Sequence, residues 1–234
     1  MTKDELKRKY LDWANNSPEA IAKREARAEK RRLAEANAVP VKIVNEWVTS
    51  DTHFLHDNIL ELEANTRQFF DRDDMTEELI RRWNSKVMPD DNVYHLGDFG
   101  FAGSTTLEPI IERLNGNKHY IFGNHDHAMR KERIAKHFVW MKEYAELKID
   151  GHKICLSHYP MLEWNCAQHG SLHFHGHLHS NRVVGRSMDV GCDSNDCYPH
   201  NIRDLITKLM QNDIVTHYHK VSEQKQPKLV VDNS

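Results

Sequence analysis

Five short polar motifs constrain this chain more than any other feature, because their side chains are of the kinds that hold metal ions in proteins. These side chains are carboxylates, imidazoles and one amide. In chain order, the motifs are Asp51-Thr52-His53, Gly97-Asp98, Gly123-Asn124-His125-Asp126, Ser157-His158 and Gly176-His177-Leu178-His179. Mixed oxygen and imidazole ligands suit manganese, iron, zinc, nickel or cobalt better than calcium. The spacings suit two divalent ions that share one carboxylate, and we predict such a pair, with manganese as the leading candidate.

The motifs follow short apolar runs bounded by glycine, which is typical of strands that open into loops. Such runs cover residues 46–50, 93–96, 119–122 and 172–174. In an extended chain, residues i and i+2 point to the same side, so a strand that ends at Asp51 would aim Asp51 and His53 at one point. His177 and His179 repeat this spacing. In open α/β sheets, ligands bind at such strand ends.

The chain resembles the calcineurin-like metallophosphoesterases, whose five sequence blocks occur here in the same order between about Trp47 and about Asp189. One position departs from the family pattern. Phe99, Gly100 and Phe101 follow Gly97-Asp98, so the second aspartate of the second family block is absent. In the family that aspartate supports the site and is not a ligand. The resemblance implies an α/β fold, in which two facing β-sheets are flanked by helices and the metals lie at one edge.

The resemblance also assigns roles to the motif residues. One ion would take Asp51, His53, Asp98 and His179, and the other would take Asp98, Asn124, His158 and His177. The family's nucleophile is a solvent hydroxide between the metals, with its pKa lowered toward about 7. His125 would donate a proton to the leaving oxygen as a general acid, and Asp126 would orient its ring.

Other polar residues leave two interpretations open. His56 is either a substrate contact or a surface histidine. Arg67 either holds a phosphate with two N–H groups or forms a surface salt bridge. For His95 we expect a structural role, and we expect His173 and His175 to be strand residues or neighbours of the ligands, not further ligands.

These assignments predict an enzyme, a metallophosphoesterase that hydrolyses a phosphodiester or a phosphomonoester, with nucleotides among the candidate substrates. Two alternatives use different features of the chain. A nuclease would use the basic N-terminal segment as a clamp, but the net charge of −6 over residues 41–212 argues against nucleic acid as the substrate. A non-catalytic, metal-stabilised scaffold would have no use for His125.

Composition divides the chain into three parts. Residues 1–40 carry a net charge of +3 and predict a helical extension, in which Ser17 caps a helix that begins at Pro18. Leu6, Tyr10 and Trp13 form an apolar stripe on a preceding helix. Residues 41–212 form the metallophosphoesterase domain. We predict helices that begin at the capping box of residues 74–77 and at residue 107, a hairpin of residues 138–150 with 152–156, a strand over 187–190 and a helix over 201–211. Residues 213–234 form a tail.

Four cysteines give no disulfide pattern, and we interpret Cys192 and Cys197 as reduced thiols. No signal peptide or membrane-spanning run is visible, so we expect a cytoplasmic protein without a membrane partner. The expected partner is a small phosphate ester or a nucleotide, while the oligomeric state stays open.

Overall fold

The computed structural model describes residues 2, 4–5, 16–36 and 44–215, in two units that divide between Ile43 and Val44. In the first unit, α2 (Pro18–Ala36) begins where the sequence predicts. The backbone N–H of Ala20 donates to Ser17 Oγ at 3.3 Å, and Pro18 occupies the first helical position, where a missing N–H costs nothing. The predicted stripe of Leu6, Tyr10 and Trp13 lies outside the described residues.

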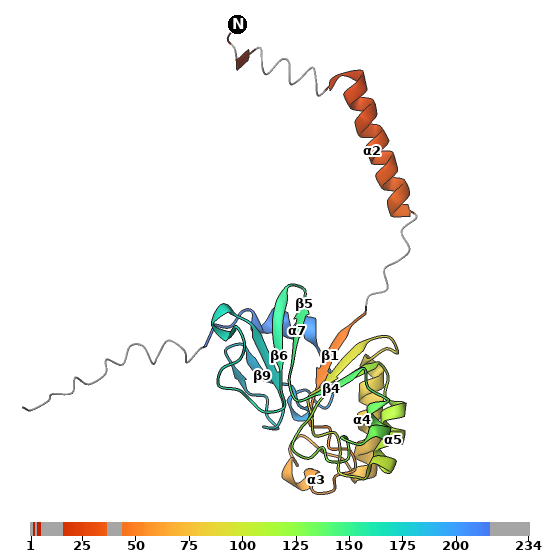
Figure 1. Cartoon of the computed structure of the whole chain (residues 1–234), viewed down its shortest axis with the longest axis vertical. Helices are drawn as coiled ribbons and strands as arrows, with labels where there is room; N and C mark the ends of the chain where they lie inside the picture. The colour runs from red at the N-terminus through yellow and green to blue at the C-terminus, as the bar shows by residue number, and fades with distance from the viewer. Residues whose placement is uncertain (1, 3, 6–15, 37–43, 216–234) are drawn as a thin grey trace, which may run out of the picture. The chain divides into compact units, whose positions relative to one another are not determined.

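The second unit contains two five-stranded mixed sheets (Figure 1). In the first sheet β1 to β4 are parallel and β10 is antiparallel to β1; in the second sheet β6, β7 and β9 are parallel and lie between two antiparallel edge strands. The strand orders are β10 (His200–Asn201), β1 (Glu46–Thr49), β2 (Asn92–His95), β3 (Asn117–Ile121) and β4 (Trp140–Lys142), then β5 (Ala145–Ile149), β6 (His152–Leu156), β7 (Leu172–His175), β9 (Ser187–Asp189) and β8 (Val183–Val184).

The carboxyl ends of the parallel strands of both sheets meet at one edge. A parallel bridge between Ser50 and Gly191 joins the chain just after β1 to the chain just after β9. The loops that follow β1, β2 and β3 therefore face the loops that follow β6 and β7. All five motifs lie in these loops, as expected for a site built at strand ends.

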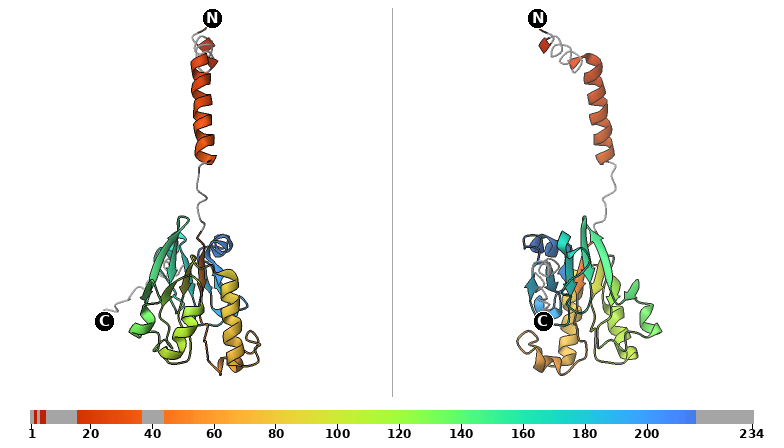
Figure 2. Two further views of the ribbon diagram at one scale, coloured as in Figure 1. Left: turned by 90° about the vertical axis from the view of Figure 1, so that its right-hand side faces the viewer. Right: turned by 60° about the vertical axis from the view of Figure 1, so that its left-hand side comes forward.

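Helices cover the outer face of the first sheet, and a second core fills the space between the sheets. Figure 1 shows α4 (Arg72–Lys86) and α5 (Ser104–Arg113) on the side of the first sheet that is turned away from the second, and Figure 2 gives two further views of the same unit. The helical layer also contains α3 (Ile59–Leu62) and α6 (Glu132–Ala135). The last helix, α7 (Ile202–Leu209), contributes Ile202, Leu205, Ile206 and Leu209 to the core between the sheets. The predicted fold class is confirmed.

Several element boundaries differ from the predictions. The helix predicted to begin at the capping box begins earlier, because the Asp71 carboxylate accepts the N–H groups of Asp73 and Asp74 at 3.0 and 2.8 Å. The helix predicted from residue 107 begins at Ser104. The segment before the Asp150-Gly151 turn divides into two strands, β4 in the first sheet and β5 in the second. Among the described helices, none combines the length and the apolar character that a membrane crossing requires.

Candidate metal centre

The motif residues converge through an unusual backbone conformation. Five of the seven predicted ligands have positive φ angles, a region that non-glycine residues seldom occupy. They are Asp51 (53°), His53 (48°), Asp98 (54°), His177 (72°) and His179 (47°). Strand alternation therefore does not align Asp51 with His53 as the sequence predicts, since β1 has ended at Thr49 and tight turns aim the side chains instead. Strained backbone of this kind clusters at functional sites.

The first group of candidate ligands consists of Asp51, His53 and His179. Asp51 Oδ1 lies 4.0 Å from His53 Nε2 and 4.0 Å from His179 Nε2. Asp51 Oδ1 and His53 Nε2 are buried and have no hydrogen-bond partner. Because an unpaired buried polar atom costs free energy, two of them facing each other fit a cation held between them. Burial lowers the pKa of His53, with Arg67 adding to the effect, so its imidazole is in the neutral, metal-binding form.

The second group consists of Asp98, His158 and His177. His158 Nδ1 donates to the Leu96 carbonyl oxygen at 2.8 Å, which leaves Nε2 as the ring nitrogen available to a metal ion. This Nε2 lies 2.9 Å from Asn124 Oδ1 and 3.6 Å from Asp98 Oδ2, which are also acceptors. Two ligands that each lie about 2.1 Å from one ion, at roughly a right angle, are about 3.0 Å apart. The spacing of these acceptors therefore suits a shared cation.

Asp98 links the two groups. Its Oδ2 lies 3.9 Å from His53 Nε2 in the first group and 3.6 Å from His158 Nε2 in the second. Its Oδ1 accepts the backbone N–H of His125 at 2.9 Å, which holds the carboxylate in place. The structure thus brings together all seven sequence-predicted ligands, and one oxygen of Asp98 faces both groups.

Two glycines make room for the ligand carboxylates. A Cβ atom at Gly123 would collide with Asp98 Oδ1, and one at Gly176 would collide with Ser50 Oγ and Asp51 Oδ2. Burial raises the pKa of Asp51 to about 7, against the opposing effect of His179 and His158, so the carboxylate needs a positive partner to stay ionised at lower pH. Among the described residues, Glu108, Glu112 and His137 form a third group of possible ligands, but Arg133 and Lys136 already pair with Glu108.

Asp193 is a site residue that the sequence analysis missed. Its Oδ2 accepts from His179 Nδ1 at 2.8 Å, which leaves His179 Nε2 directed at Asp51. A carboxylate behind a ligating imidazole fixes the tautomer and the orientation of the ring. Although burial raises the pKa of Asp193, hydrogen bonds from His179 and Arg67 hold it well below its usual value. Asp193 lies in the segment from Cys192 to Cys197, in which the sequence pattern points to the cysteines and not to the aspartate. These cysteines are free thiols.

Arg67 does not have either of the roles that the sequence analysis weighed. Its side chain is fully buried, and all five of its N–H groups have acceptors. The acceptors are both oxygens of Asp193 at 3.0 and 2.9 Å, the carbonyl oxygens of Thr52 at 2.9 Å and Asp51 at 2.5 Å, and Met75 Sδ at 3.8 Å. No N–H group remains for a phosphate. Arg67 instead ties the Asp51-Thr52-His53 turn to Asp193.

We expect Arg67→Met to destabilise the metal-free protein by about 3–5 kcal/mol, because the substitution removes the guanidinium partner of a buried carboxylate, that of Asp193. Urea denaturation in the presence of a chelator would measure the effect. Arg72→Met is the matched control, since the Arg72–Asp57 pair is exposed and such pairs contribute little. A normal free energy of unfolding together with weaker substrate binding would restore the substrate-contact interpretation.

The candidate general acid, His125, is exposed at the rim of the site, and its ring lies 4.8 Å from Phe101 and 6.1 Å from His53 between centroids. The prediction that Asp126 orients this ring does not hold. The buried Asp126 carboxylate accepts backbone N–H groups of Asp98, Phe99 and Gly123 at 3.0, 3.1 and 2.6 Å, and so fastens two motif loops together.

An aromatic ring takes the place of the family's missing aspartate. Phe101 stacks on His56 with centroids 3.7 Å apart and rings nearly parallel, and it also contacts His125. His56 in turn places its Nδ1 3.2 Å from Nδ1 of His53, so it orients a ligand. The substrate contact of His56 stays a prediction. His95 is buried and hydrogen-bonded to Thr52, as expected of a structural histidine. His173 is buried and hydrogen-bonded to Ser157 and Ser187.

Comparison with known proteins agrees with this geometry. Residues 47–190 match the calcineurin-like phosphoesterase superfamily domain. The chain is 30% identical over 175 residues to the uncharacterized protein MJ1445 of Methanocaldococcus jannaschii, covering 70% of this chain and 90% of that protein. It is 29% identical over 211 residues to the Gene 66 protein of Mycobacterium phage L5, covering 75% and 96%. The crystal structure of the protein of unknown function AQ665 from Aquifex aeolicus matches with a TM-score of 0.59 and 28% identity, covering 71% of this chain and 100% of that one. Since the matched residues span more than half of the chain and contain all five motifs, the chain belongs to the calcineurin-like phosphoesterase superfamily.

Proposed function

We propose that this protein hydrolyses a small phosphate ester, a diester or a monoester, with two divalent metal ions. The observation that carries the proposal is the pair of ligand groups that share Asp98, in which acceptor atoms face one another without donors. Bound ions would supply Lewis acidity at the phosphoryl oxygens and lower the pKa of a water molecule toward about 7, which provides a nucleophile at neutral pH.

In such a site some residues of the chain would bind the metal ions and others would orient these ligands. Asp51, His53, Asp98 and His179 would hold one ion, and Asp98, Asn124, His158 and His177 would hold the other. Asp193 and the Leu96 carbonyl oxygen orient two of the imidazoles through hydrogen bonds to Nδ1. Because these supports are buried and already paired, the ligands need little reorganisation when an ion binds.

His125 is the proposed proton donor to the leaving oxygen. Its backbone N–H is fixed by Asp98 Oδ1, while its imidazole lies exposed against Phe101. A ring that reaches the mouth of the site can approach a bound ester without being a ligand itself. The aromatic contact positions this imidazole in place of a carboxylate.

Activity on simple esters is the direct test of this function. The purified protein, reconstituted with manganese, would be assayed on p-nitrophenyl phosphate, on bis-p-nitrophenyl phosphate and then on a panel of nucleotides. We expect metal-dependent release of nitrophenol that a chelator abolishes and that manganese restores. No turnover of any ester by a protein that contains two ions per chain would refute the proposal.

We expect the N-terminal extension to be dispensable for chemistry. All motif residues lie after Pro40, and residues 1–40 contain no histidine. Removal of residues 1–40 should therefore leave the turnover of a nitrophenyl ester within a few-fold of the full chain. A folded, metal-loaded truncation that cannot cleave the ester would show instead that this segment completes the site.

A further inference from the structure

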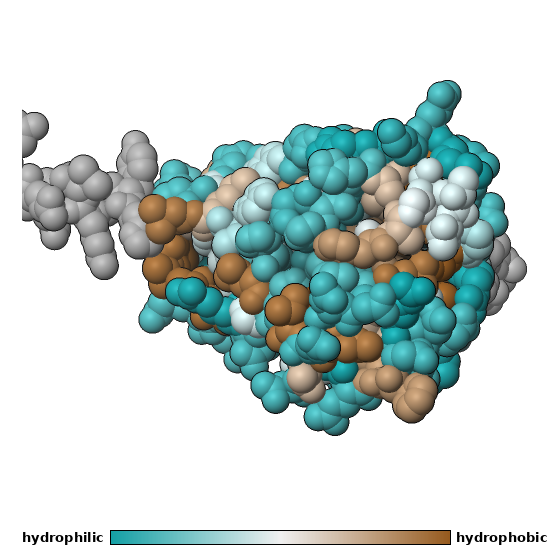
Figure 3. Space-filling model, turned by 90° about the horizontal axis from the view of Figure 1, so that it is seen from below, coloured by the Kyte–Doolittle hydropathy of each residue, from teal (hydrophilic) through white to brown (hydrophobic). Residues whose placement is uncertain are grey.

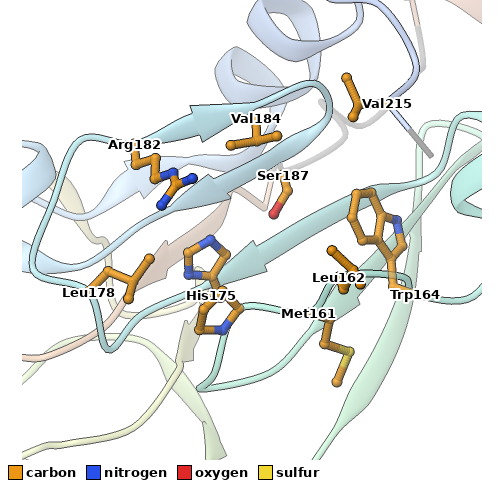
Figure 4. A pocket seen from close by; sticks show the side chains of 10 residues that line it. Met161, Leu162, Trp164, His175, Leu178, Arg182, Val184, Ser187 and Val215 are labelled. Atoms are coloured by element: carbon orange, nitrogen blue, oxygen red, sulfur yellow. The ribbon is translucent and has the colours of Figure 1, made fainter. Parts of the chain in front are cut away.

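A cleft of about 640 Å³ opens on the second sheet, and Leu178, which lies between the candidate ligands His177 and His179 in the chain, is one of its lining residues. Its volume falls within the range of small-molecule sites, about 300–1,000 Å³. Figure 4 shows Met161, Leu162 and Trp164 on one side of the cleft and Leu178, Arg182 and Val184 on the opposite side, with His175 and Ser187 between them. Most of this lining is apolar, and none of the residues that line the cleft carries a carboxylate.

Two walls of the cleft come from the loops that carry the metal ligands. Leu178 stands between His177 and His179 in the chain, and the loop that follows His158 contributes Pro160, Met161, Leu162 and Trp164. Tyr159 bridges the two loops, because its ring lies 4.7 Å from the ring of His177 and 5.0 Å from that of His158. A phosphate held at the metal centre would therefore have the cleft within reach of its organic substituent.

Several apolar side chains around this cleft are exposed to solvent, and a bound ligand would bury them. Leu162 is 71% exposed, Tyr159 51%, Val184 42% and Leu178 39%. Figure 3, which views the second unit from below, shows that several apolar patches bordered by hydrophilic residues occur on this side of the unit. Gathered apolar surface of this kind marks a binding site more often than isolated exposed residues do.

The polar groups of the cleft limit the chemistry of its ligand. His175 Nδ1 donates to the Gly176 carbonyl oxygen at 2.9 Å, so this ring nitrogen already has a partner within the chain. The guanidinium of Arg182 is a permanent cation among the lining residues, and no lining carboxylate faces it. Such a cleft suits aromatic or branched aliphatic groups that are neutral or anionic, and it disfavours cationic groups.

We propose that this cleft binds the organic group of the phosphate ester, and that this group is aromatic or branched aliphatic and carries no positive charge. The inference rests on the proposed function, since it places the phosphate at the metal centre. It makes the loop after His158 and the residue between His177 and His179 the determinants of substrate choice.

Binding of two phosphonates separates this inference from catalysis. Dissociation constants of 1-naphthylphosphonate and methylphosphonate would be measured by calorimetry on the manganese-loaded full chain. The naphthyl compound should bind at least about tenfold more tightly, since even one methylene group in an apolar pocket changes affinity by about tenfold or more. Leu162→Glu and Val184→Glu, on opposite walls, should bring the ratio of the two constants close to one.

Val139→Glu is the matched control, because Val139 is 63% exposed and does not line the cleft. This variant should keep the wild-type ratio. Turnover of nitrophenyl esters combined with a wild-type ratio near one, or with a ratio that the cleft variants do not change, would overturn the inference and leave the proposed function intact. A ratio that depends on Leu162 without turnover of any ester would refute the function and retain the cleft as an aryl site.

The chain itself offers one competing occupant. Residues 216–234 follow Val215, which lines the cleft. Removal of these residues should change the affinity for 1-naphthylphosphonate by less than about twofold. A gain of about tenfold or more would identify the tail as the occupant and would overturn the assignment of the cleft to substrate.

Discussion

Replacement of Asp98 by asparagine should abolish ester hydrolysis and remove metal from both sites at once. The carboxylate is 98% buried, and its Oδ2 faces His53 in one ligand group and His158 in the other. Loss of its charge weakens both groups together. Activity should therefore fall by more than the roughly 10–100-fold loss that removal of a supporting residue causes. Asn124→Ala should differ, because Asn124 contacts only the second group and its loss should mainly empty that site.

Elemental analysis of the variants after reconstitution with excess manganese would measure this effect. Asp73→Asn, at an exposed carboxylate, is the matched control and should retain wild-type metal content. A wild-type protein with well under one ion per chain would rule out the binuclear site. An Asp98→Asn variant that still holds two ions would rule out the bridging role.

Replacement of His125 by alanine should leave most of the metal in place and slow the reaction by about 10²–10⁴-fold, the usual contribution of general acid catalysis. Metal should remain because the His125 side chain belongs to neither ligand group. The loss should be smaller for a nitrophenyl ester than for an alkyl ester, because nitrophenolate leaves without a proton.

The rate constants of single turnovers for the two esters would test this role. His127→Ala, two residues further along the same exposed loop, should leave both rates near the wild-type values. Equal losses for the nitrophenyl and the alkyl ester in His125→Ala would contradict proton donation and would favour a role in substrate binding.

The sequence by itself predicted the fold class and the set of candidate metal ligands. Apolar runs that end at glycine and open into polar motifs specify strand ends, and parallel strands bring their carboxyl ends to a common edge. The family resemblance grouped the same residues in chain order. Residue type and spacing were sufficient to predict the strand ends and the candidate ligands, because these features are local or depend on simple topology. The two-sheet architecture and the division of the ligands into two groups came from the family resemblance.

Only the tertiary structure decided how the ligands are held. The positive φ angles of Asp51 and Asp98 contradict the extended geometry that their spacing predicts, because turns outside the strands aim these side chains. Arg67 and Asp193 are 126 positions apart in the chain, and nothing in either segment indicates that they form a buried pair behind the ligands.

Packing likewise decided the environment of the proposed proton donor and the position of the cleft next to the candidate metal centre. Asp126 follows His125 directly in the sequence, yet its carboxylate turns inward to three backbone N–H groups while the imidazole contacts Phe101. The cleft arises where loops after β6 and β7 meet the β8–β9 edge. A buried polar group takes whichever partner the packed chain brings within reach, and that choice depends on contacts between residues distant in the sequence.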